Sequence, residues 1–184
     1  MGKIDERLNR HYDDVEAVDI LHQVAYLYTS TKVPRNYGTG DDYTSLEVHT
    51  LKYIADHPGI TVTELARDHG KTKGAISQIL KKIESKGLVY RKTDPTNDNR
   101  QLLYITEKGK SLDEIHRKFD AVMFGKSMNR VRAIYSEEEV DIAFRVLESW
   151  LEIRLDIQQE RIQEKKQKAK EERLERNKAN KVKE

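Results

Sequence analysis

The chain has 184 residues, which fits one domain with a tail or one compact domain with long helical extensions. Cysteine is absent, which excludes disulfides, thiol-based redox sensing and cysteine-containing zinc sites. Charged residues make up 36% of the sequence, above the roughly 25% usual for soluble domains, and apolar residues also make up 36%. This balance predicts long helices with solvent-exposed faces.

No apolar run approaches the roughly 20 residues that cross a bilayer, and residues 1–7 lack the apolar core of a signal peptide. We therefore expect a soluble, cytoplasmic protein without a membrane partner. The net charge is only +2, but residues 71–92 contain seven cations and a single anion, Glu84. Such a basic block in a nearly neutral chain is typical of a phosphate-binding surface.

In chain order, apolar residues at helical spacing predict a first helix over about residues 5–30, before a loop with proline and glycines at 33–40. The elements predicted after it are helices over about 45–56, 62–68 and 73–86, β runs at 88–91 and 101–105 around a polar turn at 93–100, and long helices over about 107–130 and from 137 onward.

Three of these helices are predicted to start with a capping box, in which a Ser or Thr and a Glu three residues later bond each other's backbone N–H. The pairs are Thr44 with Glu47, Thr61 with Glu64, and Ser136 with Glu139. Thr106 is a weaker N-cap without the reciprocal Glu.

The order helix, short helix, helix and hairpin predicts a winged helix-turn-helix in a mostly α protein with a small β-hairpin. The flanking helices carry more surface than this small core covers, so we expect a homodimer. The predicted parts are an N-terminal dimerisation helix and linker (1–40), the winged helix-turn-helix DNA-binding domain (41–106), C-terminal dimerisation helices (107–159) and a charged tail, helical or disordered (160–184).

The fourth helix has the chemistry of a recognition helix. Its small residues allow close approach to base edges, Gln78 suits adenine, and its lysines reach phosphates. An ordinary amphipathic helix with a solvated lysine-rich face is the alternative. The residues predicted to contact DNA here are Thr72, Lys73, Gly74, Ser77, Gln78, Lys81 and Lys82.

The hairpin tip has the chemistry of a DNA-binding wing. A tip of this kind is narrow enough to enter the minor groove, whose negative potential attracts arginine. We expect Arg100 to enter it, with Asp98 holding the guanidinium in a fixed orientation. The alternative is a surface ion pair of little energetic consequence.

Together these segments resemble the MarR family of transcriptional regulators. The resemblance is close over about residues 43–119 and looser over the first and last helices. Each motif is weak alone, but their order and spacing are specific; they are residues 43–51, Thr63-Glu64-Leu65-Ala66, residues 72–88 with their Lys-Gly-Leu end, Asp98-x-Arg100 and Thr106-x-x-Gly109. Lys71 departs from the pattern, since family members often place an apolar residue there.

The resemblance implies that two chains pair through their terminal helices, that the fourth helix reads the major groove and that Arg100 enters the minor groove. A two-fold dimer implies a pseudo-palindromic operator in double-stranded DNA, with half-sites about one helical turn apart. The family also implies a regulator, more often a repressor, that a small-molecule effector releases, with no cofactor required.

Members commonly bind effectors between the dimerisation helices and the winged domain. The side chains predicted to line such a pocket are His22, Tyr26, Tyr28, His49, Tyr53 and His116; the alternative is that they are core and interface residues. A more specific hypothesis is that the protein senses zinc at this place. Zinc-sensing relatives look similar in placing ligands where His49, His116 and Asp120 fall, and imidazole and carboxylate suit zinc. A fourth ligand is not evident, although His22 is a candidate.

The tail at 160–184 has ten cations and six anions. It is interpreted first as a solvated segment, supported by pairs such as Glu164–Lys168 and Glu172–Arg176, and alternatively as an accessory DNA-contacting arm. No phosphate loop or nucleophile elbow occurs, so the sequence predicts no enzyme. A winged helix used only for protein contacts is the remaining rival.

Overall fold

The computed structural model describes residues 10–29 and 34–181. The first described helix, α2 (Asp14–Thr29), begins later than the sequence predicted, since residues 10–13 are not helical. Asp13 explains this start, because its Oδ1 accepts hydrogen bonds from the backbone N–H groups of Val15 and Glu16, both at 2.9 Å. Residues 5–9 and 30 of the predicted helix lie outside the described residues.

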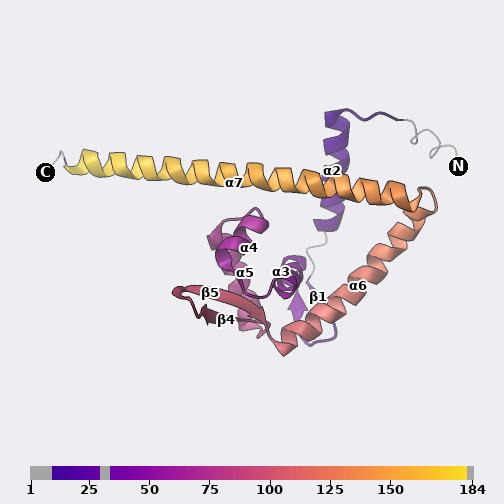
Figure 1. Ribbon diagram of the computed structural model, residues 1–184, viewed down its shortest axis with the longest axis horizontal. Helices are drawn as coiled ribbons and strands as arrows, with labels where there is room; N and C mark the ends of the chain where they lie inside the picture. The colour runs from indigo at the N-terminus through magenta and orange to yellow at the C-terminus, as the bar shows by residue number, and fades with distance from the viewer. Residues whose placement is uncertain (1–9, 30–33, 182–184) are drawn as a thin grey trace.

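The central part of the chain is a winged helix-turn-helix, as predicted (Figure 1). Its helices are α3 (Ser45–Asp56), α4 (Val62–Asp68) and α5 (Lys73–Ser85), and its strands are β3 (Ile60–Thr61), β4 (Val89–Asp94) and β5 (Asn97–Ile105). The strands form an antiparallel sheet in the order β3-β5-β4. The three predicted capping boxes are confirmed, and Thr106 accepts a hydrogen bond from Gly109 N–H.

The hairpin differs from the prediction. A polar turn was expected over residues 93–100, but only Pro95 and Thr96 separate the two strands. The Asp94 side chain closes this turn, since its Oδ1 accepts hydrogen bonds from Thr96 N (2.9 Å) and Oγ1 (2.7 Å). The polar residues that follow continue the antiparallel pairing with exposed side chains, so the wing is longer than predicted.

Two further short pairings were not predicted. Strand β1 (Arg35–Asn36) pairs with β2 (Asp42–Tyr43) where a loop was expected, and β3 joins the edge of the wing sheet. Strands of two residues are too short to show a periodicity of two, so the sequence pattern contains no signal for them.

The hydrophobic core lies where α3, α4 and α5 meet the sheet. It is formed mainly by aliphatic side chains from these elements and from the start of the following helix. Its most fully buried members are Tyr43, Leu51, Ile54, Leu65, Ile76, Leu80, Ile83, Leu88, Leu103 and Leu112.

Two long helices extend from this core. Helix α6 (Glu107–Arg132) leaves the end of the wing and leads into α7 (Glu137–Lys181), which turns back across the winged helix-turn-helix and passes α4 (Figure 1). The tail that was predicted to be helical or disordered is therefore helical up to residue 181. Among the described residues, none of these helices is both long and apolar enough to span a bilayer.

The first turn of α6 packs tightly against the residues that follow the end of α5. Thr106 N–H donates to Leu88 O at 2.9 Å, and Thr106 Oγ1 donates to Gly87 O at 2.7 Å. A Cβ atom at Gly109 would lie 2.2 Å from Leu88 O and 3.3 Å from Leu51 Cδ1. The Thr106-x-x-Gly109 motif is therefore a packing motif, because only glycine allows this approach of helix to backbone.

We expect Gly109→Ala to lower the free energy of unfolding by about 2 to 3 kcal/mol, because the clash is with backbone that cannot turn aside. Gly125→Ala in the same helix is the matched control. No atom lies within 4 Å of a Cβ there, so alanine is expected to raise the free energy of unfolding by about 0.5 to 1 kcal/mol. Urea unfolding of both variants measures the difference, and equal effects would contradict the packing argument.

Candidate nucleic-acid interface

The N-terminus of α5 is open to solvent and free of acidic side chains. Thr72 caps it, with Oγ1 accepting a hydrogen bond from Ala75 N–H at 3.2 Å. Thr72, Lys73 and Gly74 are all exposed, and the first turn contains no Asp or Glu. The partial positive charge of the helix end and the lysine therefore act together, which favours an anionic partner such as a phosphate.

The rest of α5 separates its two faces cleanly. Gln78, Lys81 and Lys82 are exposed and Ser77 is partly buried. The opposite face is buried in the core through Ile76, Ile79, Leu80 and Ile83. All seven residues that were predicted to contact DNA from this segment thus lie on its accessible side; their contact with DNA stays a prediction.

The far end of α5 is anchored to α3. Lys86 Nζ donates to Glu47 Oε1 at 3.0 Å and to Asp42 O at 2.8 Å, and lies 4.8 Å from the centre of the Tyr43 ring. Burial raises the pKa of Glu47, but hydrogen bonds from Thr44 and Lys86 outweigh it and hold this pKa below its ordinary value of 4.5. The buried carboxylate therefore stays ionised and fixes the helix end.

The single anion of the basic block is already paired. Arg91 Nε donates to Glu84 Oε1 at 2.6 Å. Because this pair cancels one positive and one negative charge, the remaining lysines of α5 present their charge without a competing carboxylate nearby on that helix.

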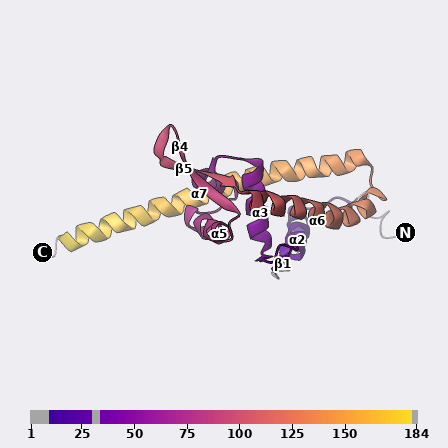
Figure 2. The ribbon, with the colours of Figure 1, turned by 90° about the horizontal axis from the view of Figure 1, so that it is seen from below.

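The wing arginine has different partners from those predicted. Arg100 Nη2 donates to Glu64 Oε1 at 3.2 Å, and its Nε lies 3.7 Å from Asp94 Oδ2. No ion pair joins it to Asp98 in the described part of the chain, so that expectation was wrong. The reason is position: Asp94 lies at the turn of the β4–β5 hairpin, which projects from the body (Figure 2), Glu64 lies on α4, and Arg100 turns toward both of them.

The residues predicted to line an effector pocket do not come together as one set. The rings of His49 and His116 meet at 4.8 Å, whereas Tyr53 stacks on His57 at 4.2 Å and donates to Asp68 Oδ2 at 3.0 Å. His22, Tyr26 and Tyr28 lie on the exposed surface of α2.

The three predicted zinc ligands do lie together. One ligand atom from each of His49, His116 and Asp120 falls within 4.8 Å of the others. His116 is 2% exposed, and neither of its ring nitrogens makes a hydrogen bond to any residue that the structure describes, although Nε2 lies 3.3 Å from Asp120 Oδ2. Burial lowers the pKa of His116, against the opposing effect of Asp120, and so favours the neutral ring that binds metals. His22 does not belong to this group.

Several residues around these sites were not predicted from the sequence. Tyr37 places its ring edge-on to His116 at 5.6 Å and to Phe119 at 5.9 Å, closing the side of the histidine cluster. Glu64 and Asp94 hold the wing arginine. Asp94 carried a usable signal, since Asp before Pro-Thr is typical of a side-chain-closed turn, but the Glu64 contact spans 36 residues and has no local signature.

Comparison with known proteins agrees with this architecture. Residues 41–98 match the model of the MarR family. The chain is 28% identical over 120 residues to an uncharacterised HTH-type transcriptional regulator of Bacillus subtilis, YhjH, covering 62% of this chain and 65% of that one. It is 31% identical over 71 residues to the transcriptional regulator HosA of Escherichia coli O111:H-, covering 39% and 53% respectively. The chain thus spans less than two thirds of the length of these relatives.

Solved structures share the fold. Streptococcus pneumoniae FabT, in a complex with DNA, superposes with a TM-score of 0.56 and 22% identity over 77% of this chain and 94% of that one. MepR of S. aureus, also in a DNA complex, gives a TM-score of 0.57 and 19% identity over 78% and 99%.

Proposed function

We propose that the chain, whose residues 41–98 match the model of the MarR family, is a DNA-binding transcriptional regulator of that kind. It acts as a homodimer on a pseudo-palindromic operator in the cytoplasm, most simply as a repressor, and a small-molecule effector releases it. This is a binding function and requires no catalytic group or cofactor.

One observation carries the proposal: two elements with the chemistry of groove readers belong to one rigid unit. The exposed side of α5 offers a capped helix end, Gln78 and unpaired lysines, and the wing offers Arg100. Both elements contribute to the same hydrophobic core, α5 through Ile76 and Ile83 and the wing through Leu103, so they are held in a fixed relation. The DNA complexes of FabT and MepR, which share this fold, support the same use here.

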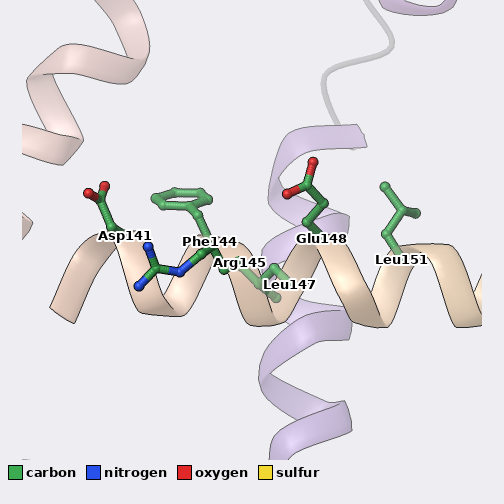
Figure 3. Close-up of a pocket in the computed structure, with 6 residues that line it drawn as sticks. All are labelled: Asp141, Phe144, Arg145, Leu147, Glu148 and Leu151. Atoms are coloured by element: carbon green, nitrogen blue, oxygen red, sulfur yellow. The ribbon is translucent and has the colours of Figure 1, made fainter. Parts of the chain in front are cut away.

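The exposed apolar side chains of the long helices support the homodimer. On α7, Phe144, Leu147, Trp150 and Leu151 are each at least 40% exposed. Figure 3 shows a shallow pocket on this helix, whose six lining residues, Asp141, Phe144, Arg145, Leu147, Glu148 and Leu151, all come from α7 itself. A hollow lined by one helix is open on the side that a second chain would cover, and burial of this surface would stabilise a dimer.

The contact between α3 and α6 is the best candidate place for an effector. His49 on α3, His116 on α6 and Tyr37 before α3 meet there, and the buried ring nitrogens of His116 lack hydrogen-bond partners. Unsatisfied buried polar atoms are costly, so a ligand that bonds them gains affinity. Since α6 leads to the dimer helices and α3 supports α5, a ligand here would act on both.

The same cluster favours a second candidate function, regulation by zinc. His49, His116 and Asp120 supply three ligands of types that zinc binds, and burial, which lowers the pKa of His116, favours the neutral ring that a metal requires. Zinc would supply a charge that draws α3 and α6 together, and a water or a partner-chain group would complete the site.

Selection of bound duplexes from a random pool tests the main proposal. We expect a recovered site with two-fold symmetry and half-sites about one helical turn apart. Recovery of asymmetric sites would contradict the homodimer, and failure to enrich any duplex would contradict DNA binding itself.

Two substitutions, one of the wing arginine and one of its partner on α4, should change the affinity for the recovered duplex in opposite directions. Arg100→Ala should weaken binding by roughly tenfold or more, because a minor-groove arginine is lost, without changing the oligomeric state. Glu64→Gln keeps an acceptor for Thr61 but removes the charge that holds Arg100; it should strengthen binding by up to about fivefold, since an exposed pair contributes at most about 1 kcal/mol. Fluorescence anisotropy measures both, with Lys110→Ala on α6 as the control.

Zinc titration of metal-free protein separates the second candidate from the first. If the cluster is a zinc site, zinc raises the melting temperature and changes affinity for the duplex, and His49→Ala abolishes both effects whereas His11→Ala, an exposed histidine outside the cluster, does not. Unchanged melting and affinity on adding zinc to the parent protein would rule the zinc function out.

A further inference from the structure

Helix α7 is docked on the helix-turn-helix in cis. Gln159 Nε2 donates to Arg67 O, at the end of α4, at 3.1 Å. A Cβ atom at Gly70, in the turn between α4 and α5, would lie 3.2 Å from Leu155 Cδ2 and 3.4 Å from Gln158 Cγ. Ile162 is 9% exposed. This docked segment, residues 155–162, uses positions spaced by three and four, so one face of α7 is turned toward the winged unit.

Beyond the docked segment the same face becomes basic. Continuing at helical spacing from Ile162, it carries Lys165, Lys166, Ala169, Lys170 and Arg173, all exposed. We call the four cations among them the α7 stripe. None of the four has an ion-pair partner within the described part of the chain.

The nearby acidic residues lie off this face. Glu160, Glu164 and Glu171 fall on the opposite side of the helix by the same spacing, and Glu172 pairs with Arg176 at 3.6 Å. The expected Glu164–Lys168 pair does not form between these two described residues. A merely solvated helix gains from mixing its charges at spacings of four, so the segregation seen here is better suited to a polyanionic partner.

We propose that the α7 stripe binds the phosphate backbone of the duplex read by the winged helix, alongside the groove that α5 enters. The inference rests on the proposed DNA-binding function and extends it to a second contact. The docked segment fixes α7 at Gly70, two residues before Thr72, which caps α5. The α7 stripe therefore extends from the winged unit in a fixed direction. In both views α7 continues past the wing (Figures 1 and 2).

The dimensions agree with this partner. Residues 165 to 173 rise about 12 Å along the helix axis. One DNA strand places a phosphate about every 3.4 Å of duplex axis, so the stripe matches roughly three to four phosphates. Phosphate contacts carry no base preference, so the stripe adds affinity without altering the sequence that α5 and the wing select.

The test compares two double variants that remove the same charge from the same helix. Lys166→Gln with Arg173→Gln removes the centre of the stripe, and Arg161→Gln with Lys168→Gln removes two exposed cations from the flank of α7. The probe is the duplex selected by the parent protein, extended by about ten base pairs at each end, one helical turn. Anisotropy is measured over a series of salt concentrations, and circular dichroism checks that both variants keep the parent's helix content.

We expect the stripe variant to bind roughly tenfold more weakly and its slope of log K against log salt to fall by about 1.8, from two lost phosphate contacts. The flank variant should bind as the parent does. If both double variants match the parent, or both weaken equally, the stripe is not a DNA contact and the inference fails while the proposed function stands. If the parent itself binds no duplex, it is the proposed function that fails.

Discussion

The close approach of α6 to the backbone of Leu88 is the contact on which the arrangement of this molecule depends. Leu88 follows the stop of α5 and begins the wing, and its carbonyl accepts the Thr106 N–H that starts α6. Gly109 lets the helix lie directly on this carbonyl. Helix α5, the wing and the helix that leads to the proposed dimer surface therefore meet at one peptide, and a tilt of α6 must move α5 or the wing with it.

For the proposed regulator, this junction offers a physical route from a bound effector to DNA. His116 lies on α6 seven residues, or about two turns, beyond Gly109, and faces His49 on α3. Helix α3 in turn holds the end of α5 through the ion pair between the buried Glu47 and the partly buried Lys86. A ligand that changes the spacing of α3 and α6 thus acts on α5 from two sides. Coupling of this kind needs only packed, discrete contacts and no long-range movement of the chain.

The sequence predicted the helices of the winged unit to within about one residue because their boundaries are local. A threonine and a glutamate three residues apart decide where α3 and α4 begin, and Gly87 and Pro58 follow the ends. The wing was predicted less well, since Asp94 closes its turn with a side chain while polar residues that look like a loop form strand β5. Asp98 was chosen as the partner of Arg100 for its nearness in sequence, whereas the observed partner Glu64 is near only in the fold.

The pairing of Arg100 with Glu64 and Asp94 bears on how the wing works. Both carboxylates are partly or largely engaged elsewhere, Glu64 Oε2 with Thr61 and Asp94 Oδ1 with Thr96, so each offers its second oxygen to the guanidinium. The side chain of Arg100 is 46% exposed, and an ion pair this exposed contributes no more than about 1 kcal/mol. Such a pair orders the arginine in the free protein. The guanidinium can leave these carboxylates at low cost for a DNA groove with a stronger negative potential. Glu64 therefore orders Arg100 without holding it tightly, and in the proposed complex most of the affinity for DNA would come from the cations of α5 and α7.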